Sequence, residues 1–341
     1  MSKQVCILYT GGTIGMRPTA QGYAPEPGYL QELMAAMPEF AHPDLPGYTL
    51  VEYPELLDSA NMRPWHWQRI AEDIASRYTA FDGFIILHGT DTMAYTASAL
   101  PFMLEGLGKP VVLTGSQIPL CRVRSDARDN LVTALALIAQ EPIAEVCLCF
   151  GNRLLRGCRS TKVDAAGFQA FDSPNYPDLG SIGVTIRVHK EFVRPACPAS
   201  APWVRSLSDA KVGALRLFPG IQAEFVANVL RSPVQGLVLE TYGMGNGPSS
   251  DTALLEVLRA AHDRGVVMVN CTQCLRGQVD QHGYAAGSAL AQAGVVSGVD
   301  MTVEAALTKL IYLFSMGLSA QEIRAHIPIN MRGELTAPSG V

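Results

Sequence analysis

Strand-length runs of apolar residues set the first constraint on the fold of this chain. The runs are continuous, as expected for strands that are buried on both faces of a sheet. In the first 190 residues they are VCILY (5–9), FIILH (84–88), VVLT (111–114) and VCLCF (146–150). Amphipathic helical patterns separate them, and such alternation is typical of a doubly wound parallel sheet. We therefore expect an α/β fold with a mostly parallel sheet.

Three helices are expected between these strands. RPWHWQRIAEDIASRYT carries an apolar face, and its Pro64 suits the first turn of a helix. A largely apolar helix is expected over residues 94–107, where Pro101 should kink or interrupt it. A third helix is expected over residues 129–138. Trp65 and Trp67 are interpreted as packing residues of the first helix.

The chain is long enough for two domains, since 341 residues exceed most single cores. The alternation fails over residues 191–210, where prolines and small polar residues are typical of a linker. It resumes with VGALRLF, GLVLETYG and VVMVNCT, and an apolar helix over 303–316 should cover one face. We expect a larger N-terminal domain (1–190), a linker and a smaller C-terminal α/β domain (211–341).

Composition excludes several classes of protein. The net charge is −5 and the basic residues are scattered, which argues against a nucleic-acid surface. No apolar run is long enough to span a membrane. Met1–Gln4 leads directly into the first strand without the features of a signal peptide, so a cytoplasmic location is expected.

The eight cysteines are expected to stay reduced. Cys147 and Cys149 alternate on a strand and are interpreted as small core residues. Cys271 and Cys274 have CxxC spacing, but no second Cys/His pair accompanies them, so a structural role is favoured over zinc. Neither a metal nor a cofactor is expected.

Hydroxyl groups and glycines follow three of the predicted strands. The sequences are Thr10-Gly-Gly-Thr13, His88-Gly-Thr-Asp-Thr92 and Thr114-Gly-Ser-Gln117. In open α/β sheets the ligand crevice lies outside the carboxyl ends of the strands, so these groups should face one crevice. No nucleotide-binding fingerprint follows a strand, because Gly108-Lys109 precedes one instead. Each hydroxyl taken alone is more typical of a helix cap, but three together favour a site.

A hydroxyl is a weak nucleophile and needs a base nearby. Asp91 follows Thr90 directly, and Lys162 lies in a loop after the fourth strand that can return to the same edge. Lys162 can equally be a surface charge, and the sequence leaves both interpretations open. His88 is interpreted as a buried structural histidine and not as the base.

These motifs resemble the signatures of bacterial-type L-asparaginases. TGGTIG (10–15), HGTDTM (88–93) and TGSQIPL (114–120) carry the resemblance, which continues through RSDARDNL, STKVDAAGFQAFDSPN and YGMGN. The chain is most similar to the cytoplasmic type I branch. The resemblance implies hydrolysis of L-asparagine to L-aspartate and ammonia through a β-aspartyl ester on a threonine, without a cofactor. Weak activity on glutamine is expected, because one methylene group separates the two substrates.

The resemblance assigns roles to five residues. It implies that Thr13 is the nucleophile and that Thr90, Asp91 and Lys162 form a second triad. The glycines around Thr13 allow backbone amides to approach the substrate carbonyl. A catalytic tyrosine falls on Tyr23, in a segment rich in glycine and proline that is interpreted either as a mobile lid or as a static loop.

Substrate contacts are implied for Gly12, Asp58, Ser59, Gly89, Thr90, Asp91, Ser116 and Asn246. Ser59 corresponds to the serine that holds the α-carboxylate, and Asp91 should hold the α-amino group. From the residues alone, Asp58-Ser59 would be interpreted as a helix cap. Ala60 stands where secreted relatives often carry glutamine, so one contact is missing. Asn246 corresponds to a residue from a neighbouring subunit, which implies a dimer or a dimer of dimers.

Some type I enzymes also bind asparagine at an effector pocket. The corresponding positions are Thr161, Glu240 and Cys274. The cooperative enzyme has an arginine where this chain has Glu240, and a glutamate should repel the effector carboxylate. We therefore expect no asparagine activation, unless another basic residue such as Arg276 supplies the charge.

Two other functions compete with this interpretation. The amidase subunit of a tRNA-dependent amidotransferase shares the fold but carries an additional N-terminal domain, whereas this chain begins at the first strand. An amino-acid sensor would keep the pocket without a nucleophile. The joint presence of Thr13, Thr90, Asp91 and Lys162 argues against a sensor.

Overall fold

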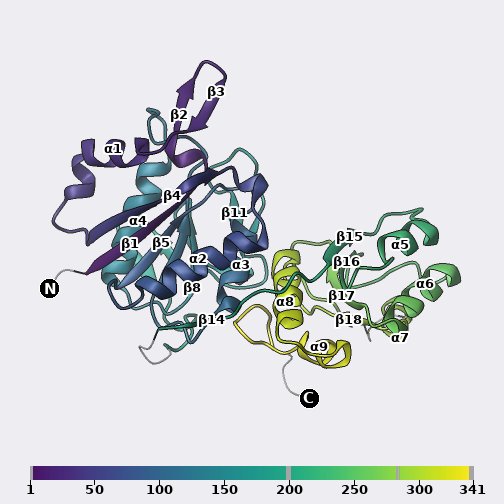
Figure 1. Cartoon of the computed structure of the whole chain (residues 1–341). Coiled ribbons are helices and arrows are strands. Elements are labelled where there is room, and N and C mark those ends of the chain that lie inside the picture. The colour runs from purple at the N-terminus through teal and green to yellow at the C-terminus, as the bar shows by residue number, and fades with distance from the viewer. Residues whose placement is uncertain (1–2, 197–200, 282, 284, 338–341) are drawn as a thin grey trace. The chain divides into compact units, whose positions relative to one another are not determined.

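The computed structural model describes residues 3–196, 201–281, 283 and 285–337. The chain divides into two compact units, Met1–Arg205 and Ser206–Val341, which are described separately (Figure 1). The N-terminal unit is built on a large sheet and the C-terminal unit on a smaller parallel sheet. The expected α/β fold class is confirmed.

The sheet of the N-terminal unit has eight strands in the order β13-β12-β9-β8-β7-β5-β1-β4. Its parallel part consists of β4 (Gly47–Leu57), β1 (Gln4–Gly11), β5 (Gly83–Leu87), β7 (Val111–Thr114) and β8 (Val146–Phe150). β9 (Arg153–Arg156), β12 (Gly180–Ile182) and β13 (Ile186–Val188) extend it in antiparallel fashion. The parallel strands therefore end together at one edge of the sheet.

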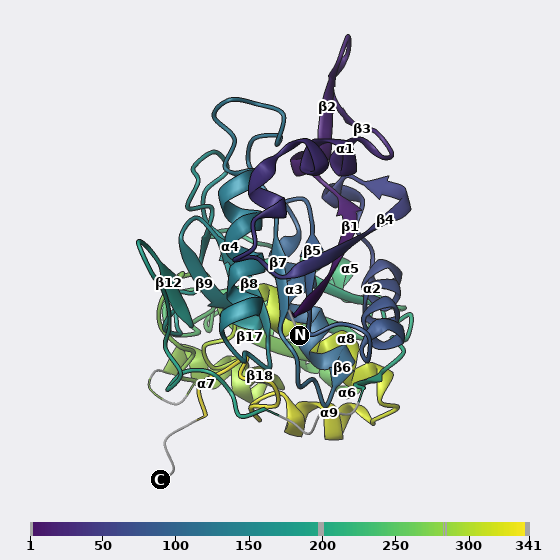
Figure 2. The same ribbon diagram turned by 90° about the vertical axis from the view of Figure 1, so that its left-hand side faces the viewer.

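Helices cover both faces of this sheet (Figure 2). α1 (Tyr29–Ala36) and α4 (Ala127–Gln140) pack in one apolar core with residues of β1, β5 and β7. α2 (Pro64–Arg77) and α3 (Met93–Met103) contact each other on the other face. Pro101 lies inside α3, and the helix ends at Met103, short of the expected residue 107. Trp67 is buried as expected, whereas Trp65 is 55% exposed, with its ring centroid 3.5 Å from that of His66.

Short elements complete the N-terminal unit. β2 (Met16–Thr19) and β3 (Gly22–Pro25) form a hairpin that projects beyond the rest of the unit (Figures 1 and 2). β10 (Thr161–Lys162) pairs with β11 (Phe171–Asp172). The single turns are η1 (Thr13–Gly15), η2 (Pro38–Ala41), η3 (Ser59–Asn61) and η4 (Gly157–Arg159).

The segment between the two sheets contains a paired strand. β14 (Trp203–Val204) lies within residues 191–210 and pairs with β6 (Leu104–Glu105), which follows α3. Arg205 continues this contact, since its backbone N–H donates to the Met103 carbonyl at 3.0 Å. Of the expected linker, residues 191–205 therefore fall in the N-terminal unit and residues 206–210 in the C-terminal unit.

The C-terminal unit contains a four-stranded parallel sheet in the order β15-β16-β17-β18. Its strands are β15 (Val212–Arg216), β16 (Gly236–Thr241), β17 (Val267–Thr272) and β18 (Val295–Ser297). α5 (Ala223–Val229), α6 (Thr252–Asp263) and α7 (Ala285–Gln292) lie on one face, and α8 (Val303–Ser315) on the other (Figure 1). α8 spans the helix expected over 303–316, and α9 (Ala320–His326) follows it.

A fully buried ion pair anchors the end of the described chain to α8. Lys309 Nζ lies 2.6 Å from Glu334 Oε1, and both side chains are completely buried. Lys309 also donates to the backbone carbonyls of Ile327 and Ile329. Burial opposes ionisation of Glu334, but the charge and hydrogen bond of Lys309 hold its pKa below the usual value.

The described cysteines are mostly buried and all of them are free thiols. Cys147 and Cys149 are buried in the core, as expected. Cys271 is buried and Cys274 exposed, and none of the described cysteines forms a disulfide. None of the described helices is both long and apolar enough to cross a membrane. Within the same residues, no group of three or more His, Cys, Asp or Glu side chains is arranged to hold a metal ion.

Candidate active site

The end of β1 lies directly against the end of β5. Gly11 and Gly12 have φ angles of 124° and 90°, in the region that favours glycine. A Cβ atom on Gly12 would lie 2.5 Å from the backbone nitrogen of Gly89, so only glycine allows this approach. Thr13 begins η1 immediately afterwards and is partly exposed. The two glycines therefore bring Thr13 to the loop that follows β5.

The buried ring of His88 contacts that loop and α3. Its Nδ1 lies 2.7 Å from the Gly89 carbonyl and its Nε2 lies 2.8 Å from Thr96 Oγ1. Trp67 Nε1 donates to the same threonine at 3.0 Å. Burial lowers the pKa of His88 to about 4, so the imidazole is neutral at pH 7. This environment agrees with a structural histidine and not with a general base.

The end of β4 brings Ser59 to the same place. Ser59 is buried, and a Cβ atom on Gly89 would lie 2.5 Å from Ser59 Oγ. Thr92 Oγ1 donates to the Ser59 carbonyl at 2.8 Å. Asp58 caps η3 by accepting a hydrogen bond from the Ala60 backbone at 3.0 Å. The capping interpretation is therefore correct for Asp58, while Ser59 lies against Gly89 of the site.

Lys162 joins Thr90 and Asp91 in one cluster. Its Nζ donates to Thr90 Oγ1 at 2.8 Å and to Asp91 Oδ1 at 2.7 Å. Thr90 is buried and the Lys162 side chain is only 20% exposed, whereas the Asp91 side chain is 64% exposed. Lys162 is therefore not an isolated surface charge. The carboxylate of Asp91 holds the ammonium group in place and remains accessible to a ligand.

The loop after β7 contributes two more polar side chains. Ser116 is buried, and its Oγ finds no hydrogen-bond partner among the described residues. Gln117 Oε1 lies 3.3 Å from Thr90 Oγ1, a contact that sequence reasoning missed. Asp126 at the start of α4 accepts hydrogen bonds from the backbone N–H groups of Gln117 and Ile118 and fixes this loop.

The segment expected as a lid or a static loop is the hairpin of β2 and β3. Tyr23 lies on β3, paired with Pro18 of β2, and its side chain is 43% exposed. The base of the hairpin is tied by an exposed ion pair between Arg17 and Glu26 at 2.8 Å. The approach of Tyr23 to the nucleophile stays a prediction.

The remaining predicted residues belong partly to the C-terminal unit. Asn246 closes a turn after β16, and its backbone exchanges hydrogen bonds with Tyr242. Asn246 Oδ1 is buried without a hydrogen-bond partner among the described residues. Glu240 on β16 lies 3.6 Å from Arg216, and Cys274 is exposed. Thr161 lies on β10 of the N-terminal unit, so the effector pocket stays a prediction.

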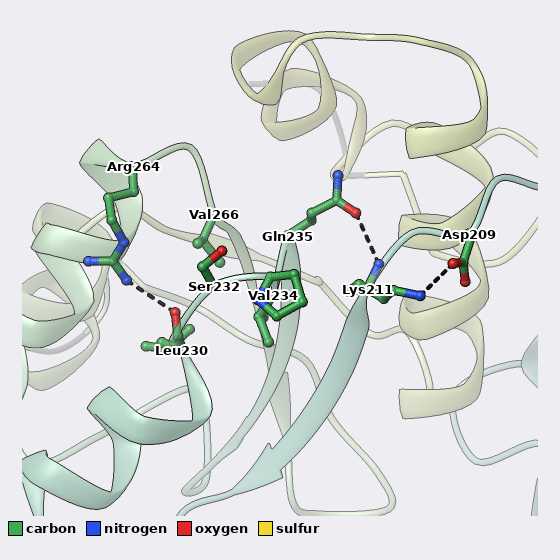
Figure 3. A pocket seen from close by; sticks show the side chains of 9 residues that line it. Asp209, Lys211, Leu230, Ser232, Val234, Gln235, Arg264 and Val266 are labelled. Atoms are coloured by element: carbon green, nitrogen blue, oxygen red, sulfur yellow. Dashed lines mark hydrogen bonds and ion pairs between the residues drawn. The ribbon is translucent and has the colours of Figure 1, made fainter.

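A pocket of about 530 Å³ lies at the amino-terminal edge of the C-terminal sheet, where β15, β16 and β17 begin (Figure 3). Its two cationic side chains already have partners. Lys211 pairs with Asp209, and Arg264 donates to the Leu230 carbonyl at 3.1 Å. Gln235 accepts a hydrogen bond from the Lys211 backbone at 3.0 Å. These pairings stabilise strand and helix ends, so the cluster around Thr90 remains the candidate site.

Comparison with known proteins gives matches over most of the chain. The family model "Asparaginase, N-terminal" matches residues 4–194, and the model "Glutaminase/Asparaginase C-terminal domain" matches residues 211–327. L-asparaginase 1 of Escherichia coli (strain K12) is 53% identical over 336 residues, which cover 98% of both chains.

Two further proteins are also similar to this chain. The crystal structure of L-asparaginase I from Vibrio cholerae is 49% identical, with a TM-score of 0.91 over 98% of this chain and 100% of the other. The 60 kDa lysophospholipase of Mus musculus is 44% identical over 99% of this chain and 63% of its own length.

Proposed function

Because the chain belongs to the asparaginase family, we propose that it hydrolyses the side-chain amide of L-asparagine to give L-aspartate and ammonia. We further propose weak activity on L-glutamine and a location in the cytoplasm. The observation that carries the proposal is the contact of Lys162 with both Thr90 and Asp91, beside the glycine turn that precedes Thr13.

The substrate is expected to bind through its two charged ends. Ser59 Oγ, next to Gly89, suits the α-carboxylate, and the free oxygen of Asp91 suits the α-ammonium group. The unpaired hydroxyl of Ser116 is available for the side-chain amide. Glutamine needs room for one more methylene group, a difference of about 1–3 kcal/mol in transition-state binding. This supports a preference for asparagine.

In the first half of the reaction, Thr13 Oγ1 attacks the amide carbon. Its proton passes to Tyr23 Oη when the hairpin closes, while Tyr23 passes its own hydroxyl proton to the amide nitrogen, and backbone N–H groups around Gly12 and Gly89 stabilise the developing oxyanion. The carbon–nitrogen bond then breaks, and the protonated nitrogen departs as ammonia. Thr13 remains linked to the β-carboxyl carbon as an ester.

In the second half, water attacks this ester. Thr90 takes a proton from the water while it passes its own proton to an unprotonated Lys162, and Asp91 holds the lysine in position. The ester bond breaks, L-aspartate leaves, and the proton returns to Thr13. Since this relay needs a lysine that can accept a proton, activity should hold from neutral into alkaline pH. A pH optimum near 4 would contradict this mechanism.

The test is ammonia release from asparagine and from glutamine. Thr13→Ala and Thr90→Val should each lower kcat by more than about 10³-fold while leaving the fold intact, because each removes a reacting hydroxyl at a strand end and no large core side chain. Thr185→Val removes an exposed hydroxyl of the same kind and serves as the control, with unchanged kcat. Near-normal turnover in both active-site variants would refute the mechanism.

We also propose that the protein is a homo-oligomer, either a dimer or a dimer of dimers. Phe218, Met244 and Leu275 follow β15, β16 and β17, and all three are at least 42% exposed at the carboxyl edge of the C-terminal sheet. Two buried polar atoms nearby, Asn246 Oδ1 and Tyr242 Oη, have no hydrogen-bond partner among the described residues. A second copy would cover the apolar groups and place Asn246 in the neighbouring site.

Complementation between two inactive variants tests this arrangement. Thr90→Val and Asn246→Ala are each expected to have low activity as homo-oligomers. In a mixed dimer, one site combines an intact Thr90 with the neighbour's intact Asn246, so random mixing should restore about a quarter of the wild-type activity. Light scattering that finds a fully active monomer would refute the proposal, as would a mixed oligomer without any gain in activity.

A further inference from the structure

The hydroxyl group of Thr90 lies between two side chains with different hydrogen-bonding capacity. Lys162 Nζ lies 2.8 Å from Thr90 Oγ1, and Gln117 Oε1 lies 3.3 Å from it. An ammonium group that is paired with Asp91 can only donate. Thr90 therefore accepts from Lys162 and must direct its own proton elsewhere, and Gln117 Oε1 is the acceptor on that side.

The orientation of the Gln117 amide follows from its other contact. Gln117 Nε2 donates to the Gly167 carbonyl at 3.0 Å. A backbone carbonyl can only accept, so the NH₂ group must face Gly167 and the oxygen must face Thr90. The backbone N–H of Gln117 is held by the Asp126 carboxylate at 3.0 Å and 3.1 Å. Gln117 is thus fixed at both its backbone and its amide.

The contact between Gln117 and Thr90 is longer than an ordinary hydrogen bond between oxygen atoms. Catalytic hydrogen bonds are often long in sites without substrate and tighten when substrate binds. Only the last few tenths of an ångström are needed here, and the amide already faces the hydroxyl. A chain of hydrogen bonds then runs from Lys162 Nζ through Thr90 Oγ1 to Gln117 Oε1, which accepts the last of them.

We propose that Gln117 is a positioning residue that directs the Thr90 proton away from Lys162 and so sets the pH at which the pair begins to activate water. With the acceptor present, the chain of hydrogen bonds favours the ammonium form of Lys162, which is the resting form. Without it, the Thr90 proton turns toward Lys162, which favours the unprotonated amine. This inference rests on the proposed function, in which Thr90 and Lys162 form the relay.

Three carboxylates face Lys162 and Gln117 in the N-terminal unit. Asp91 pairs with Lys162, and Asp126 holds the Gln117 backbone. Asp164 accepts hydrogen bonds from the backbone of Ala166 and Gly167, which lower its pKa, and the Lys162 charge adds to this effect. A substitution at Gln117 leaves all three carboxylates in the chain. A change in the pH dependence would then come from the side chain at this position.

The experiment measures kcat and KM for asparagine between pH 5 and pH 10 in two variants. Gln117→Met removes the acceptor, so the ascending limb of the kcat profile should move to lower pH by about 0.5–1 unit. Gln117→Glu places a negative charge beside Thr90, so the limb should move to higher pH by a similar amount. The KM should stay within about three-fold of wild type in both, because Gln117 contacts Thr90 and none of the groups proposed to bind the substrate.

A matched control comes from Gln68→Met, which removes an exposed amide that donates to Glu72 on α2. Its profile should match the wild type. If Gln117→Met fails to fold, Gln117→Glu still decides the question, because its limb must move to higher pH. A purely structural role would lower kcat equally at every pH without moving the limb, and that result in the folded variants would overturn the inference.

The wild-type enzyme separates this inference from the proposed function. If the wild type releases no ammonia from asparagine, or if Thr90→Val keeps full activity, the proposed function has failed. If both behave as expected and the limb stays in place in the Gln117 variants, only the role of Gln117 is refuted.

Discussion

Replacement of Gly12 by alanine should separate the two strand ends on which the proposed reaction depends. The new Cβ atom would lie 2.5 Å from the backbone nitrogen of Gly89 and 2.6 Å from its Cα. These neighbours are backbone atoms, so no flexible side chain can move aside to make room. The ends of β1 and β5 must therefore move apart, and Thr13 moves away from Thr90 and Asp91.

The expected loss of activity follows from this geometry. Contacts of a Cβ atom below 3.0 Å are essentially never observed, so the backbone must shift by at least about 0.5 Å. A misplacement of about 1 Å can cost about 100-fold in rate, so kcat for asparagine should fall about 10- to 100-fold. The φ angle of 90° adds backbone strain of about 1–3 kcal/mol to the free energy of folding.

Gly106→Ala is the matched control for this strain. Gly106 has a φ angle of 84°, and a Cβ atom there would meet nothing within 4 Å. The control should therefore lose similar stability in urea unfolding but keep kcat within about two-fold, because only its backbone conformation is strained. The reasoning is refuted if folded Gly12→Ala keeps its kcat, or if Gly106→Ala loses as much activity.

The remaining predictions concern stability and kinetics. Burial lowers the pKa of His88 to about 4, while the unfolded chain binds this proton near pH 6.5; the free energy of unfolding should therefore fall by about 3 kcal/mol as the pH drops from 7 to 4. Urea unfolding at several pH values measures this, and His88→Gln should lose that part of the pH dependence. Lys309→Met leaves the buried carboxylate of Glu334 without its counter-ion and should cost about 3–5 kcal/mol, whereas the double variant with Glu334→Leu should recover only part of it, because the backbone N–H groups of Met331 and Arg332 then lose their acceptor. An unchanged unfolding midpoint in the single variant would contradict this. Glu240 should repel the carboxylate of a second asparagine, so initial rates should follow a near-hyperbolic curve. A clearly sigmoidal curve from a stable oligomer would overturn that expectation.

The sequence was sufficient for elements whose pattern is local. The continuous apolar runs at 5–9, 84–87, 111–114 and 146–150 lie in buried strands, because burial on both faces leaves no polar alternation, and His88 lies just beyond the end of β5. The capping sequence before α9 was also readable, since Ser319 and Glu322 satisfy each other's backbone groups at a spacing of three residues. The sequence analysis predicted α8 as the last helix and did not predict α9.

Other elements gave weak local signals. β4 was not predicted, because its burial pattern is mixed and it carries Glu52 and Glu55 at the edge of the sheet. It was nevertheless needed for the site, since its end delivers Ser59 to Gly89. An edge strand depends on one neighbour for its hydrogen bonds, and no local pattern says which strand that neighbour will be.

The motifs of the site were visible in the sequence, but their partners were not. The resemblance implied that the glycines before Thr13 let backbone amides approach the substrate carbonyl, but the close approach of Gly12 to Gly89 is seen only in the fold. Lys162 reaches Thr90 across 72 positions of the chain, and Gln117 reaches it across 27. Such contacts depend on how the loops return to one sheet edge, which is decided by the packing of the whole N-terminal unit. Composition and spacing describe what each segment can do, and tertiary structure decides which atoms it meets.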